Sequence, residues 1–135
     1  MRIYPIPLIA AWLLSCFTVT AQDDTRYTLL LKRGNIIPVK NINSTSISSF
    51  NNRASRSAGK SFAILQFEHI PTVAERQQLF QEGIELLDYI PNNAYTVTIT
   101  GSLNETTLQR VQARAIIEPT AQQKMQQELA LGDFP

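Results

Sequence analysis

Between residues 62 and 118 the sequence contains six segments, four strand-like and two helix-like, and their order constrains the fold more than any other feature. Short apolar or alternating runs bounded by turn residues are typical of strands. Capped stretches with apolar residues three or four positions apart are typical of helices. The expected order is strand 62–67, helix 72–82, strand 84–90, strand 95–100, helix from 102 or 104 to about 112, and strand 113–118.

The two expected helices have recognisable start and stop signals. Thr72 and Glu75 form a capping box, in which the hydroxyl accepts from the Glu75 amide and the carboxylate reaches back to the cap. Gly83 provides the stop of this helix. The second helix begins either at Ser102, as a second capping box, or at Asn104, as a hydrophobic staple.

This order within so short a span predicts an α+β fold of the ferredoxin-like βαββαβ type. Such a plait has one four-stranded antiparallel sheet with both helices on one face, and it leaves the other face open. A β-hairpin is expected before it, at residues 22–42, because strand-like residues flank Gly34-Asn35. The Ser- and Asn-rich stretch at 43–61 has few large apolar residues, so we expect a flexible linker there.

The alternation of residues 95–100 supplies the candidate binding residues, because apolar side chains alternate there with three threonines. If the apolar row meets the helices, the threonines lie on the open face, where a partner could cover them. Plain solvent-facing strand residues would give the same periodicity. Tyr89 and Tyr95 flank the hairpin turn, and each is either a core or a rim residue. The candidate partner-binding residues are therefore Thr96, Thr98, Thr100, Tyr89 and Tyr95.

The first 21 residues are typical of a secretory signal peptide, with Arg2 followed by a 12-residue apolar run at 8–19. Such a run is too short to span a membrane, and no second apolar run long enough to do so follows. We expect cleavage between Ala21 and Gln22, and a secreted, periplasmic or cell-surface location. Lipidation of Cys16 is the alternative to ordinary cleavage.

The composition excludes several classes of function. The chain has 12 Lys and Arg against 11 Asp and Glu, and loss of the leader removes Arg2, so the mature chain is neutral and no bulk charge favours nucleic acid. The single Cys lies in the leader and only one His remains, so no disulfide, thiol nucleophile or metal cluster is expected. We expect no catalytic residue and no cofactor, and hence no enzyme; the oligomeric state stays open.

The run from Leu87 to Tyr95, Leu-Asp-Tyr-Ile-Pro-Asn-Asn-Ala-Tyr, together with Leu65-Gln66-Phe67, resembles the amino-terminal region of secreted bacterial subtilisin-like serine peptidases. The resemblance implies a propeptide with a ferredoxin-like fold, which acts as an intramolecular chaperone and temporary inhibitor. The implied partner is a subtilisin-like catalytic domain, in cis or in trans. The Asp, His and Ser motifs of that peptidase are absent from this chain.

Residues 119–135 are polar and compatible with a helix, and we expect them to lead into such a downstream domain. The alternative is a stand-alone secreted or surface-attached module for protein binding or adhesion. A reading frame that ends at Pro135 would favour this alternative, whereas one that continues into a peptidase domain would exclude it.

Overall fold

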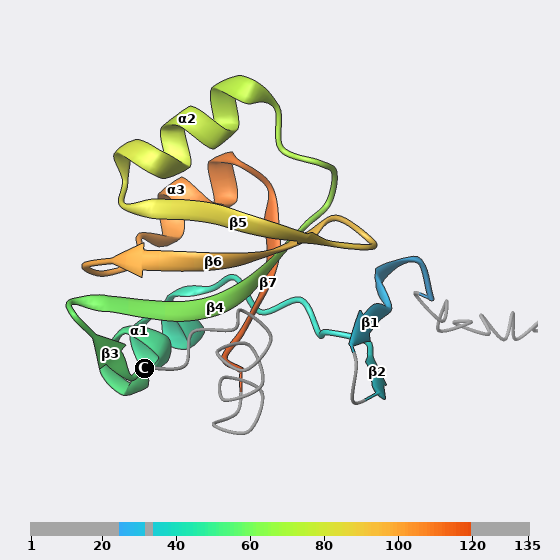
Figure 1. Ribbon diagram of the computed structural model, residues 1–135, viewed down its shortest axis with the longest axis horizontal. Coiled ribbons are helices and arrows are strands. Elements are labelled where there is room, and N and C mark those ends of the chain that lie inside the picture. Colours follow the sequence, from blue (N-terminus) through green and yellow to red (C-terminus); the bar gives the residue numbers. More distant parts are fainter. Residues whose placement is uncertain (1–24, 32–33, 120–135) are drawn as a thin grey trace, which may run out of the picture.

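Strand β4 is the centre of the fold in the computed structural model, which describes residues 25–31 and 34–119 (Figure 1). The described chain is α+β, with two antiparallel sheets and three α-helices. The elements are η1 Thr25–Tyr27, β1 Leu29–Leu31, β2 Gly34–Ile36, α1 Ser44–Arg53, β3 Arg56–Ser57, β4 Lys60–Phe67, α2 Val73–Gln81, β5 Ile84–Ile90, β6 Ala94–Thr100, α3 Glu105–Arg110 and β7 Ala113–Ile117. The expected signal peptide, its cleavage site at Ala21 and Gln22, Cys16 and residues 120–135 lie outside the described residues.

The larger sheet has the strand order β3-β4-β6-β5, and β7 also pairs with β4. Strand β6 occupies one edge of β4 along its length, with Phe62 opposite Thr98. Strands β3 and β7 share the other edge: β3 pairs with the start of β4 and β7 with its second half. All these pairs are antiparallel, and the short strand β3 makes the sheet five-stranded instead of four-stranded.

The capping signals of both expected helices are confirmed. The Thr72 hydroxyl accepts from the Glu75 amide at 3.3 Å, and the Glu75 carboxylate accepts from the Thr72 amide at 2.7 Å. Helix α3 begins after Asn104, whose side chain accepts from the Thr106 amide at 2.9 Å, so Asn104 and not Ser102 is the cap. Local side-chain chemistry therefore determines where these two helices start.

The main core lies between the sheet and the helices, all three of which contribute to it. Helices α1 and α3 lie behind the sheet in the view of Figure 1. The largest buried side chains of this core come from every layer: Phe50 of α1, Leu65 and Phe67 of β4, Leu79 of α2, Val97 and Ile99 of β6, and Leu108 of α3. Burial of such side chains, each worth about 1.5–3 kcal/mol, is the main force that holds the layers together.

The prediction of a flexible linker at residues 43–61 is wrong, because this stretch forms α1, β3 and the start of β4. Asn43 caps α1 by accepting from the Ser46 amide at 2.9 Å, and Ile47 and Phe50 are buried in the main core. Serine-rich helices have weak intrinsic propensity, so α1 depends on tertiary packing. Two apolar residues on one face, added to a surface that the sheet provides, are enough.

The N-terminal hairpin is confirmed, since β1 pairs antiparallel with β2 and Leu29 lies opposite Ile36. Gly34 and Asn35 belong to β2, where the sequence favoured a turn. No α-helix among residues 25–31 and 34–119 is long and apolar enough to cross a membrane.

Candidate partner-binding face

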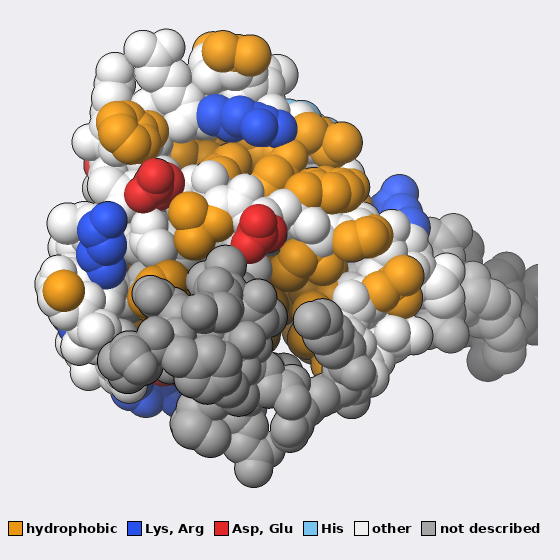
Figure 2. Space-filling view, in the orientation of Figure 1, with side chains coloured by type: hydrophobic (Ala, Val, Ile, Leu, Met, Phe, Trp, Pro, Cys, Tyr) orange, Lys and Arg blue, Asp and Glu red, His pale blue; other side chains and the backbone are white. Residues whose placement is uncertain are grey.

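The sheet face opposite the helices, here called the outer face, contains the three candidate threonines. Tyr95, Val97 and Ile99 are buried in the main core, so the intervening residues of β6 point the other way, as the alternation predicts. The outer face is made by Phe62, Ile64 and Gln66 of β4 and by Thr96, Thr98 and Thr100 of β6. Figure 2 looks onto this side of the molecule, and the surface left visible beside the grey residues shows hydrophobic side chains between a few charged groups.

Tyr89 and Tyr95 do not join the threonines. Tyr95 belongs to the helix side. Its ring packs edge-on against that of Phe67, with the ring centres 6.2 Å apart, and its hydroxyl accepts from the Arg76 guanidinium at 2.8 Å. Tyr89 lies opposite Tyr95 in the register, and the centres of the two rings are 5.2 Å apart. The five candidate residues are therefore divided between the two faces of the sheet.

The threonines differ in what they offer to a partner. Thr98 is only 7% exposed and its hydroxyl donates to the Glu85 carboxylate at 3.4 Å. The Thr96 hydroxyl accepts from the Asp88 amide at 3.0 Å, whereas Thr100 is exposed. Because Thr98 is buried and hydrogen-bonded, replacing it by arginine to test the outer face would disturb the fold itself. A substitution at this position therefore cannot report on binding alone.

Phe62, which sequence reasoning assigned to a buried strand, is a large and exposed apolar residue of the outer face. It lies opposite Thr98 in the register and is 40% exposed. The neighbouring residues Ala63, Leu65 and Phe67 face the main core. The apolar run of β4 hides this difference, because a continuous run does not say which side chains point outward.

The N-terminal segment covers one end of the outer face. Leu29 is fully buried and packs with Ile64 and Ala94 in a second, smaller core. The fully buried Gln66 donates from Nε2 to the carbonyl of Tyr27 at 2.9 Å and to that of Asn92 at 3.0 Å. The part of the outer face that stays accessible is therefore the end with Phe62 and Thr100.

A cluster of polar and charged side chains holds this segment in place, and we call it the anchor cluster: Tyr27, Lys40, Gln66, Glu68 and Arg114. The Arg114 guanidinium lies 3.9 Å from the centre of the Tyr27 ring and donates to the Pro38 carbonyl at 2.7 Å. The Tyr27 hydroxyl donates to the Glu68 carboxylate, which also pairs with Lys40 at 3.1 Å. Sequence reasoning missed this cluster, because its members are distant in the chain.

The anchor cluster predicts a pH dependence of stability. The hydrogen bond from Tyr27 holds the pKa of Glu68 below its ordinary value, and the same hydrogen bond, with burial, raises the pKa of Tyr27. The lowered pKa of Glu68 stabilises the fold at pH values above the ordinary carboxyl pKa. This contribution is lost as the pH falls through the pKa that Glu68 has in the folded protein. The raised pKa of Tyr27 stabilises the fold at pH values below the ordinary tyrosine pKa. This contribution is lost as the pH rises through the pKa that Tyr27 has in the folded protein.

Tyr27→Phe removes both contributions. We expect its unfolding free energy to be lower than that of the parent by about 1 kcal/mol at neutral pH. The gap should narrow at acid and at strongly alkaline pH, as measured by urea unfolding at a series of pH values. A gap that stays constant across this series would contradict the assignment.

The single histidine of the chain has a structural contact. His69 Nε2 lies 3.3 Å from the Glu75 carboxylate, which belongs to the capping box of α2. Within residues 25–31 and 34–119, no three His, Cys, Asp or Glu side chains are close enough to hold a metal ion.

Comparison with known proteins gives one match. A family model described as "Domain of unknown function (DUF8729)" matches residues 30–120, which is more than half of the chain and runs from β1 past the end of β7. No curated protein and no solved structure matches.

Proposed function

The chain belongs to the family described as Domain of unknown function (DUF8729), and we propose that it acts as the propeptide-like module of a secreted subtilisin-like serine peptidase. In this role the chain carries out no catalysis. It binds a folded catalytic domain through the accessible part of the outer face and assists its folding.

The topology supports this proposal. Four strands in the order β7-β4-β6-β5, with α2 and α3 as the connections between strands, follow the ferredoxin-like pattern that the resemblance implies. The additional helix α1 and the N-terminal hairpin are extensions to that pattern, because both lie before β4 in the chain.

The single observation that carries the binding site is the exposure of Phe62. An aromatic side chain at the accessible end of a sheet face, 40% exposed, leaves apolar surface in water that a partner would cover. Its neighbour across the sheet, Thr98, is β-branched and already hydrogen-bonded, so little side-chain freedom is lost when the face is covered. Aromatic residues with such rigid surroundings are typical centres of protein interfaces.

Binding of this kind explains a chaperone effect in physical terms. A module that binds only the native peptidase lowers the free energy of the native state by mass action. Attachment in the same polypeptide raises the effective concentration of the module, so that even modest affinity gives a large effect.

The test is to replace Phe62 and a matched exposed phenylalanine by arginine. Phe80 is 66% exposed on α2, on the helix side of the sheet. We expect Phe62→Arg to weaken binding to subtilisin-like catalytic domains of the source organism at least tenfold, because it puts an unpaired charge into the interface. Phe80→Arg should change affinity less than twofold. Affinity, and the yield of peptidase refolded in the presence of the chain, are the measurements.

Two outcomes would count against the proposal. Equal loss of affinity in both variants would reject the outer face as the contact surface. Absence of binding to any subtilisin-like domain, with both variants folded, would reject the peptidase partner and favour the stand-alone binding module.

A further inference from the structure

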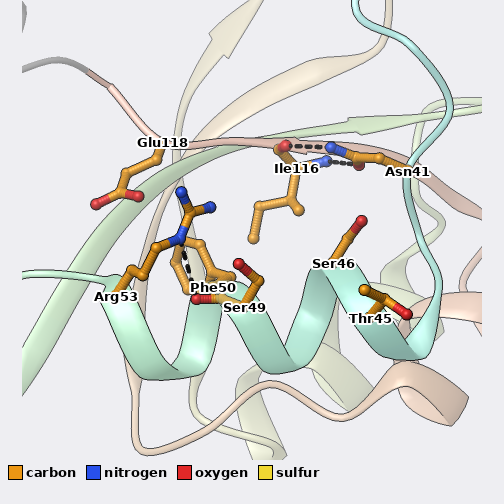
Figure 3. Close-up of a pocket in the computed structure, with 8 residues that line it drawn as sticks. All are labelled: Asn41, Thr45, Ser46, Ser49, Phe50, Arg53, Ile116 and Glu118. Atoms are coloured by element: carbon orange, nitrogen blue, oxygen red, sulfur yellow. Dashed lines mark hydrogen bonds between the residues drawn. The ribbon is translucent and has the colours of Figure 1, made fainter.

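A polar hollow of about 230 Å³ lies between helix α1 and strand β7 (Figure 3). It is separate from the accessible end of the outer face. Its floor is apolar, because it is formed by the buried side chains of Phe50 and Ile116. Its wall on the α1 side carries the hydroxyls of Thr45, Ser46 and Ser49, for which the described part of the chain provides no hydrogen-bond partner.

One end of the hollow is closed by Asn41. Its side-chain amide donates to the Ile116 carbonyl at 2.9 Å, and its side-chain oxygen accepts from the Ile116 amide at 2.8 Å. This carboxamide therefore takes the place of a neighbouring strand and saturates the backbone of β7 at Ile116. An added β-strand is excluded as the occupant at that position, since the backbone groups it would use are already bonded.

The other end carries two opposite charges. The guanidinium of Arg53 and the carboxylate of Glu118 both lie at this end in Figure 3, and among the described residues no ion pair within 4.0 Å joins them. Arg53 uses Nε to donate to the Ser49 carbonyl at 3.3 Å. Among residues 25–31 and 34–119, its two terminal nitrogens have no hydrogen-bond acceptor.

From this arrangement we propose that the hollow binds a zwitterionic α-amino acid with a small branched apolar side chain. The carboxylate lies against the terminal nitrogens of Arg53, a pairing with strong geometric preference. The ammonium lies against Glu118, and the side chain rests on the floor formed by Phe50 and Ile116. The α1 hydroxyls supply further donors to the carboxylate.

The same features argue against other small ligands. A phosphate would meet the carboxylate of Glu118 at the mouth of the hollow, and like charges repel. The volume suits a ligand smaller than a drug-sized molecule.

The experiment is a titration of the full chain, followed by the backbone amide resonances, with L-valine and two analogues. The analogue 3-methylbutanoate lacks the ammonium, and 2-methylpropylamine lacks the carboxylate. We expect valine to shift the resonances of Ser46, Ser49 and Glu118, and each analogue to bind about fivefold more weakly, because each loses one exposed ion pair.

Variants give the second part of the test. Arg53→Gln should weaken valine binding about fivefold, and Glu118→Gln should make valine bind no better than 3-methylbutanoate. Arg110→Gln, which removes the same charge from α3, should leave binding unchanged. The proposal is overturned if valine shifts no resonance of the hollow, if the analogues bind as well as valine, or if Arg110→Gln has the effect expected of Arg53→Gln.

Discussion

Gly83→Ala is expected to lower the free energy of unfolding by about 3–4 kcal/mol, a large part of the stability of a small protein. Gly83 follows α2 with φ of +80°, a conformation that costs an L-residue about 1–2 kcal/mol. A Cβ at this position would also lie 2.6 Å from the carbonyl oxygen of Thr100. That oxygen cannot retreat freely, because the Thr100 amide donates to the Gly83 carbonyl at 2.8 Å.

Gly101→Ala is the matched control for this prediction. Gly101 has nearly the same backbone conformation, with φ of +84°, but a Cβ there would meet no atom within 4 Å. We expect it to lose only the conformational part, about 1–2 kcal/mol. Urea unfolding of both variants separates the two contributions, and equal losses would show that the contact with Thr100 relaxes at no cost.

The features predicted from sequence are those whose cause is local. The Thr72 capping box lies within one turn of a helix, and the alternation of β6 follows from the pleat of a single strand. Gly83 was recognisable as a helix stop for the same reason. Its second role, the close approach to Thr100, was not recognisable, because the distance between a turn and a strand leaves no trace in either segment alone.

The features that sequence reasoning missed depend on partners far along the chain. The Ser- and Asn-rich composition of α1 predicts a linker, because the sequence of this segment does not reveal the surface that buries Ile47 and Phe50. The Asn41 side chain pairs with the backbone of Ile116, 75 positions away. Of the candidate site, the position of the threonines was predictable, whereas the outward direction of Phe62 followed only from the register with Thr98.

Gln66→Met is the second prediction with a large effect, and we expect it to lower the free energy of unfolding by about 3 kcal/mol. Gln66 is fully buried, and its amide donates to the carbonyls of Tyr27 and Asn92 while its oxygen accepts from Arg114 at 3.4 Å. Methionine has a similar volume, so no cavity opens. The cost comes from buried polar groups that lose their partners, at about 1–3 kcal/mol each, with part of this recovered by relaxation.

Gln109→Met is the control, because Gln109 is exposed on α3 and its side-chain amide donates to the Glu105 carboxylate at 2.8 Å. Losing such a pair on a helix surface costs about 0.2–0.5 kcal/mol. In Gln66→Met we also expect faster amide hydrogen exchange at Leu29, since Gln66 joins the N-terminal segment to β4. If exchange at Leu29 stays as slow as in the parent, the segment is held by Arg114 and Tyr27 without help from Gln66, and the anchor cluster would consist of those two residues with Glu68 and Lys40.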